Sequence, residues 1–162
     1  MEKAIHVLHV LGGVGLGGAE SRIMDLYRQM DRERIQFDFL VHAGSGSDAG
    51  EEPQAGGRKP EFYDEEILSM GGHIYVLPKF KVYNYFSYKK AVRRFFERHR
   101  EFRVVQGHMT STAGIYLPIA KKAGAPVTVA HARNAGVVKG LKGIATRFFR
   151  QGLAGKADYC FA

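Results

Sequence analysis

A run of glycines near the start of the chain is the strongest candidate for a ligand-binding loop. Five glycines occupy the seven positions from Gly12 to Gly18, after an apolar run and before a helical pattern. A strand, a glycine-rich turn and a helix place backbone N–H groups around a phosphate, and glycine lets a ligand approach the main chain. A sharp turn alone also uses glycine, but this density favours a ligand-binding loop. Glu20 follows in the first helical turn, where its carboxylate either stabilises the helix dipole or contacts a polar substrate.

The glycine spacing also matches, formally, the fingerprint of a dinucleotide-binding turn, through Gly13, Gly15 and Gly18. That fingerprint requires an acidic residue at the end of the second strand, about 20 residues further on, to hold a ribose hydroxyl. Here the second strand is predicted to end at His42, and the nearby acid, Asp38, lies inside it. The sequence therefore disfavours a nicotinamide cofactor.

Histidines end three of the predicted strands, and polar residues follow two of them. The histidines are His42, His108 and His131, and the polar residues are Thr110, Ser111, Arg133 and Asn134. Ligands of open parallel sheets bind beyond the carboxyl ends of the strands. We therefore expect these side chains and the glycine turn to share one edge and to form a polar substrate site. No carboxylate or cysteine stands nearby at metal-ligand spacing, so no metal is expected. His6 and His9, inside the first strand, are interpreted as strand-end or packed residues.

The elements that must position these residues alternate between strand and helix, which predicts a Rossmann-like α/β fold with a parallel sheet and helices on both faces. The helix after residue 109 is expected to be capped by the three hydroxyl residues at 110–112. Residues 43–60 are glycine-rich and are expected to form a long loop. Strands are predicted at Ala4–Leu11, Gln36–His42, His73–Leu77, Arg103–His108, Pro126–His131 and Asp158–Ala162, and helices at Gly18–Met30, Phe62–Met70, Tyr85–His99, Thr110–Gly124 and Gly140–Leu153.

Length and composition are those of one ordinary globular domain. The chain has 162 residues, 45% of them apolar, and one cysteine, Cys160, which excludes a disulfide framework and is expected to be buried in the last strand. No apolar run approaches the roughly 20 residues of a membrane span. The first residues do not resemble a signal peptide, so a cytoplasmic location is expected.

Charge is strongly basic and concentrated in two segments. The net charge is +8, with nine basic residues from Lys79 to Arg103 and six from Arg133 to Lys156. Such segments suit an anionic membrane surface, a phosphorylated ligand or nucleic acid, and they also occur as solvated helix faces. The predicted helix Tyr85–His99 combines these charges with an aromatic stripe, which suits either core packing or an interfacial position on a membrane. No nucleic-acid-binding motif is present, so no nucleic acid partner is expected.

Several segments together resemble the N-terminal half of the retaining glycosyltransferases of family 4, which have the GT-B architecture. The resemblance covers nearly the whole chain and rests on the order and spacing of the segments. The matching segments are the strand Ile5–Val10, the turn leading into Gly17-Gly18-Ala19-Glu20, the layout Phe37–Val41 followed by a loop and Glu65-Glu66-Ile67 with Gly71-Gly72, the strand end Val104–His108, and Val127–Arg133.

The resemblance implies a role for each candidate residue. It implies that residues 1–162 form a single acceptor-side domain. It places Gly17 and Gly18 near the phosphates of a nucleotide-sugar donor, and His131 beside the transferred sugar as the catalytic residue. Substrate-binding positions are Gly17, Gly18, Glu20, His108, Thr110, Ser111, Arg133 and Asn134.

The resemblance also implies what the chain lacks. The family binds its donor in a C-terminal domain with a Glu-x7-Glu motif, and neither the motif nor that domain occurs in this sequence. Transfer in the family is metal-independent, so no cofactor is expected. The chain by itself is expected to have little or no transferase activity.

Two functional hypotheses follow. The first is the acceptor-binding domain of a membrane-associated transferase that builds a surface polysaccharide or glycolipid, with a glycan or lipid-linked acceptor and an anionic membrane surface as partners. The alternative is a non-catalytic Rossmann-like module that binds a phosphorylated small molecule or an anionic surface.

Overall fold

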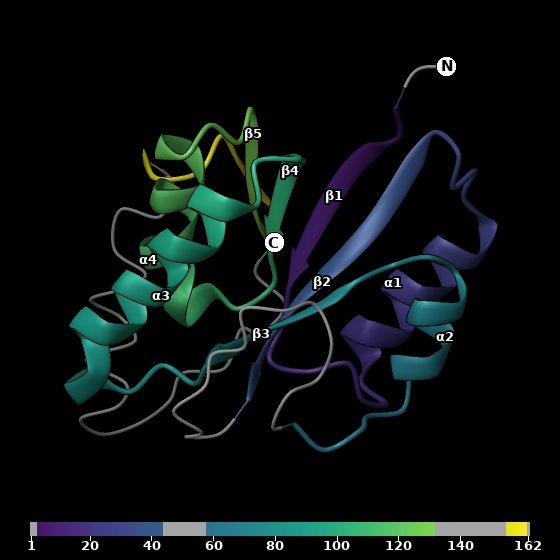
Figure 1. The fold of residues 1–162 in the computed structure, drawn as a ribbon, viewed down its shortest axis with the longest axis horizontal. Coiled ribbons are helices and arrows are strands. Elements are labelled where there is room, and N and C mark those ends of the chain that lie inside the picture. The colour runs from purple at the N-terminus through teal and green to yellow at the C-terminus, as the bar shows by residue number, and fades with distance from the viewer. Residues whose placement is uncertain (1–2, 44–57, 132–154, 162) are drawn as a thin grey trace. The chain divides into compact units, whose positions relative to one another are not determined.

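The computed structural model describes residues 3–43, 58–131 and 155–161 (Figure 1). Contacts between Cα atoms divide the chain into two compact units, Met1–Lys79 and Phe80–Ala162. Each unit alternates strands with helices, and each is described here by itself. The predicted helix at 140–153 and the long loop expected at 43–60 lie wholly or largely outside the described residues.

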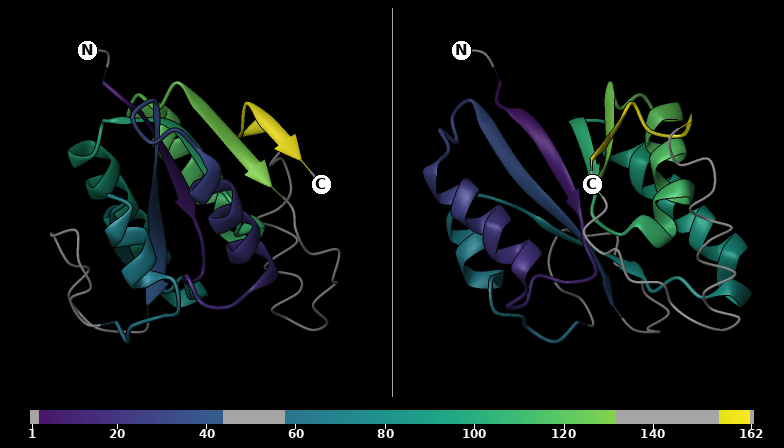
Figure 2. Two further views of the ribbon diagram at one scale, coloured as in Figure 1. Left: turned by 90° about the vertical axis from the view of Figure 1, so that its right-hand side faces the viewer. Right: turned by 180° about the vertical axis from the view of Figure 1, so that it is seen from behind.

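The first unit is a parallel three-stranded sheet with two helices. Strand β2 (Ile35–Ala43) lies between β1 (Ile5–Val10) and β3 (Ile74–Pro78) and is parallel to both. Helices α1 (Gly18–Gln29) and α2 (Asp64–Ser69) lie together on one side of this sheet in the right view of Figure 2.

The core of this unit follows from alternation along β2. Phe37, Phe39 and Val41 join one buried cluster with Tyr27 of α1 and Ile67 of α2. Burial raises the pKa of Tyr27 to about 12, so its hydroxyl stays protonated and donates to the Met70 carbonyl. Helix α2 ends as the sequence predicts, because Gly71 adopts a φ of +82°, which L side chains rarely adopt.

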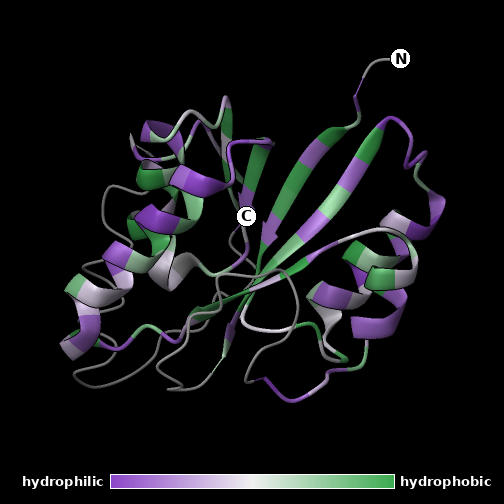
Figure 3. Cartoon of the chain, viewed as in Figure 1, coloured by the Kyte–Doolittle hydropathy of each residue, from purple (hydrophilic) through white to green (hydrophobic). Residues whose placement is uncertain are grey.

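The second unit is also a parallel three-stranded sheet. Strand β5 (Val127–His131) lies between β4 (Phe102–Gly107) and β6 (Tyr159–Phe161). Helix α4 (Thr110–Lys122) packs against β4, β5 and α3 (Tyr85–Arg98), which follows the short 3-10 helix η1 (Val82–Asn84). Apolar positions of α3 and α4 alternate with polar ones in Figure 3, and the buried face of α3 carries Tyr88, Val92 and Phe96. The aromatic stripe of the predicted helix is therefore largely core.

Two local predictions about this unit are wrong. Helix α4 is not capped by a hydroxyl residue: Met109 is its N-cap, and the Met109 carbonyl accepts the N–H groups of Thr112 and Ala113. Cys160 is exposed rather than buried. It lies in a three-residue strand that pairs with β5 at the edge of this sheet, so little packs over it.

Candidate functional site

The glycine-rich turn is anchored at its start by β2. The Leu11 N–H donates to the Leu40 carbonyl at 2.9 Å, and the Nδ1 atom of His42 lies 2.9 Å from the Leu11 carbonyl oxygen. A carbonyl only accepts, so this nitrogen of His42 carries the proton. Burial of His42 lowers its pKa, which favours the neutral ring. His42 therefore fixes the entry to the turn and is not exposed to a ligand.

The end of the turn brings three predicted residues together. Gly17 is the N-cap of α1 with extended backbone, Gly18 begins the helix, and Glu20 lies in its first turn. The Glu20 carboxylate folds back over Gly17, where a Cβ would overlap with it. This carboxylate can accept hydrogen bonds from hydroxyl groups, and the helix dipole favours its charge.

A fourth residue, Glu61, contacts the turn and was not predicted. The Val14 N–H donates to Oε2 of Glu61 at 2.5 Å, and the Val14 carbonyl accepts the Tyr63 N–H at 3.1 Å. Tyr63 is also hydrogen-bonded through its hydroxyl to Ser21 of α1, at 2.9 Å. The segment that leads into α2 is therefore hydrogen-bonded to the glycine turn and to the start of α1.

In the second unit, two of the predicted histidines lie side by side. His108 follows β4 and His131 ends β5, and their ring centroids are 5.6 Å apart with a 44° tilt. The ring of Phe161 in β6 lies 6.4 Å from that of His131. Both histidines are half-buried, and the Nδ1 atom of each ring is buried.

Tyr116 of α4 packs against the turn between β4 and α4 and holds it in place. This fully buried tyrosine donates a hydrogen bond to the Met109 carbonyl at 3.3 Å, and it packs so closely on Gly107 that a Cβ there would overlap with its ring. Burial raises the pKa of Tyr116, so it remains a donor. Thr110 and half-buried Ser111 begin α4 directly after this turn. Arg133 and Asn134 lie outside the described residues.

The structure thus gathers the predicted residues in two groups, one in each unit. Gly17, Gly18 and Glu20 form the first, and His108 and His131, next to the start of α4, form the second. In the part of the chain that the structure describes, no group of three or more His, Cys, Asp and Glu residues is arranged to hold a metal ion.

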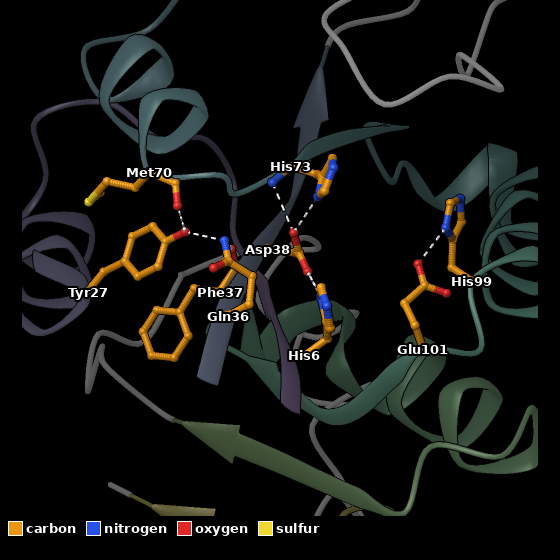
Figure 4. Close-up of polar contacts among 9 residues, drawn as sticks. All are labelled: His6, Tyr27, Gln36, Phe37, Asp38, Met70, His73, His99 and Glu101. Atoms are coloured by element: carbon orange, nitrogen blue, oxygen red, sulfur yellow. Dashed lines mark hydrogen bonds and ion pairs between the residues drawn. The ribbon is translucent and has the colours of Figure 1, made fainter. Parts of the chain in front are cut away.

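A separate cluster in the first unit joins His6, Asp38 and His73 (Figure 4). Asp38 is 1% exposed and accepts three hydrogen bonds: from Nδ1 of His6 at 2.7 Å, and from Nδ1 and the backbone N–H of His73, each at 2.9 Å. The carboxylate therefore links β1, β2 and the start of β3. His9, by contrast, packs between Phe37 and Phe39, as the sequence predicts.

Residues 17–162 match the family described as "Glycosyl transferase 4-like domain". The chain belongs to this family. Over 128 residues it is 37% identical to "Putative glycosyltransferase EpsF" of Bacillus subtilis (strain 168), a match that covers 79% of this chain and 30% of that protein. The family that the sequence resemblance indicated, a family 4 glycosyltransferase domain, is therefore confirmed.

The fold of the glycosyltransferase 4-like domain is similar to that of the crystal structure of Acinetobacter baumannii MurG. The TM-score is 0.54 at 15% identity, covering 98% of this chain and 41% of the MurG chain. This likeness confirms the predicted Rossmann-like fold of a GT-B half. The chain spans well under two thirds of either protein. Among the described residues, none of the helices has the length and apolar character needed to cross a membrane.

Proposed function

We propose that this glycosyltransferase 4-like domain is the acceptor-binding half of a retaining, metal-independent glycosyltransferase. The enzyme moves a sugar from a nucleotide-sugar donor to a glycan or lipid-linked acceptor in the synthesis of a surface polysaccharide or glycolipid. The observation that carries the proposal is the family match over residues 17–162. The 37% identity to a protein described as a glycosyltransferase supports it.

Within this proposal, His108 and His131 lie where the sugar is transferred. His131 acts beside the transferred sugar, and His108, 5.6 Å away between ring centroids, helps to line the same place. Imidazole groups can donate or accept a hydrogen bond near neutral pH, so they can hold sugar hydroxyls in either role. Thr110, Ser111, Arg133 and Asn134 border the acceptor, and Gly17, Gly18 and Glu20 line the donor side.

We further propose that the enzyme works at the cytoplasmic surface of an anionic membrane. Around η1, the residues Val82, Tyr83 and Phe86 are exposed by 65%, 82% and 84%. Lysines flank them, with Nζ of Lys81 lying 5.5 Å from the ring centre of Tyr83. Aromatic side chains surrounded by lysines suit the boundary between lipid head groups and acyl chains.

The deciding experiment compares the intact natural protein with its His131→Ala variant. We expect transfer of radiolabelled sugar to a lipid-linked acceptor in anionic vesicles, and about a hundredfold lower turnover in the variant with little change in donor binding. His99→Gln, a half-buried histidine of the same unit, is the control and should retain activity.

Equal loss of turnover and donor binding in His131→Ala would count against its place beside the transferred sugar. Binding to the vesicles without any transfer would favour the non-catalytic module instead. Sedimentation of the protein with anionic but not neutral vesicles tests the membrane contact in the same preparation.

A further inference from the structure

The glycine turn holds a negative charge that belongs to the chain itself. Oε2 of Glu61 accepts the Val14 N–H at 2.5 Å. A Cβ at Gly13 would lie 2.6 Å from Oε1 of Glu61, so the carboxylate reaches this N–H only because residue 13 is glycine. The backbone of the turn therefore receives an oxyanion at the kind of position where glycine-rich turns receive phosphates.

A cation completes the surroundings of this carboxylate. Nη1 of Arg58 lies 2.9 Å from Oε2 of Glu61, and Nη2 lies 2.6 Å from Oδ1 of Asp64. The Arg58 side chain is only 6% exposed, and its Nε atom is buried without a hydrogen-bond partner in the described part of the chain. A buried guanidinium with an unused donor is the group that proteins use to bind phosphate oxygens in a fixed geometry.

Other contacts hold this arrangement in place without the Glu61 carboxylate. Asp64 accepts the backbone N–H of Glu61 at 3.1 Å and also binds Arg58. Tyr63 is bonded to Val14 and to Ser21. The Glu61 side chain is itself 34% exposed, so its carboxylate can turn toward solvent while the N–H and the guanidinium remain where they are.

We propose that the Val14 N–H and the Arg58 guanidinium form a phosphate-binding site, which the Glu61 carboxylate occupies as an internal competitor. A phosphate group displaces the carboxylate because it offers more oxygens and more charge to the same two donors. Glu61 thereby lowers the affinity of the turn for phosphates. This site does not depend on the proposed transfer reaction and is tested without it.

The test is calorimetric titration of inorganic pyrophosphate into the intact natural protein at low salt. Glu61→Gln keeps an oxygen that can accept the Val14 N–H but removes the charge, and we expect it to bind pyrophosphate roughly tenfold more tightly. The matched control is Glu66→Gln, which removes the same charge from an acid of α2 that is paired with Arg28 of α1. The affinity of this control for pyrophosphate should stay within about twofold of that of the parent protein.

Arg58 supplies the second half of the test. Adding Arg58→Gln to Glu61→Gln should abolish the gain, and Arg58→Lys, which keeps the charge, should restore part of it if Arg58→Gln does not fold. The backbone amide resonance of Val14 should shift on titration. Equal affinity of the parent protein and Glu61→Gln would overturn the proposal, as would a gain that survives loss of Arg58 or an unperturbed Val14 amide.

Two sources of the phosphate are separated by the choice of probe. A soluble nucleoside diphosphate such as uridine diphosphate represents the donor side, and dodecyl phosphate below its micellar concentration represents a lipid phosphate. The probe whose affinity rises most in Glu61→Gln identifies the source. A gain for neither probe, like no gain for pyrophosphate, would overturn the proposal.

Discussion

Asp38 and Glu61 are both carboxylates that accept N–H groups in the first unit, but their surroundings differ. Asp38 is 1% exposed and its partners come from the sheet itself, through His6 and His73. Glu61 is 34% exposed and binds one backbone N–H beside an arginine. A buried acid with three internal donors stabilises the fold, whereas a partly exposed acid on a glycine turn can be exchanged for a ligand.

The largest effect we expect comes from Asp38→Ala. The substitution leaves three N–H donors of His6 and His73 without their acceptor beside a buried position, and it should lower the free energy of unfolding by about 3 kcal/mol. Asp38→Asn keeps one oxygen and should cost less. Urea denaturation followed by circular dichroism measures both.

Glu61→Ala is the matched comparison for that measurement, and it should cost under about 1 kcal/mol because the carboxylate is partly in solvent. If Asp38→Ala were no more destabilising than Glu61→Ala, the distinction between a structural and an exchangeable carboxylate would be wrong.

The second prediction concerns pH and the anchor of the turn. Burial holds the pKa of His42 below its ordinary value of 6.5 in the folded chain. Below about pH 6.5 the unfolded chain therefore binds a proton that the folded chain does not, so the free energy of unfolding falls as pH decreases, by up to about 1.4 kcal/mol per pH unit, until the folded pKa is reached.

This pH dependence is isolated by the variant His42→Gln, which cannot titrate in that range. Denaturation at several pH values between 7.5 and 5.5 should show a steeper decline for the parent protein than for the variant. Parallel curves would mean that protonation of His42 does not cause the loss of stability at low pH. The bond of His42 to the Leu11 carbonyl would then not be sensitive to protonation.

Local patterns predicted much of this arrangement. The alternation of apolar and polar residues predicts the strands, and glycines predict the turn at 12–18 and the end of α2 at Gly71. Each of these features depends on residues close in sequence. The packed position of His9 also follows from its place in an apolar strand.

Long-range contacts were missed because they depend on strand register. His6 lies opposite Gln36, so it reaches Asp38 two positions further along β2. Val14 and Glu61 are separated by 47 residues, and no local signal links them. Local patterns therefore placed Asp38 inside the second strand without indicating its partners, and they gave no reason to select Glu61. The position of Cys160 was wrong for a related reason, since burial in a strand depends on what covers it.

The smallest effect, and the sharpest test of the comparison, is expected from Gly13→Ala. The three atoms nearest to the added Cβ would all belong to the Glu61 carboxylate, at 2.6–3.0 Å. That group is the end of a flexible side chain and can move, so the substitution should cost about 0.5–1 kcal/mol, the scale of one modest contact. In a Glu61→Ala background the same substitution should cost nearly nothing, and this non-additivity is measurable by a double-mutant cycle.

Gly72→Ala is the counterpart on the buried side of the same unit. There the Cβ would lie 2.8 Å from the Phe37 carbonyl oxygen, which is backbone of the central strand and cannot turn away. We expect its cost to exceed that of Gly13→Ala and to be unaffected by Glu61→Ala. If Gly13→Ala were as costly in the absence of the Glu61 side chain as in its presence, the carboxylate would not be the group that fills the space beside Gly13. The turn would then be closed by its own backbone, leaving no place for a phosphate.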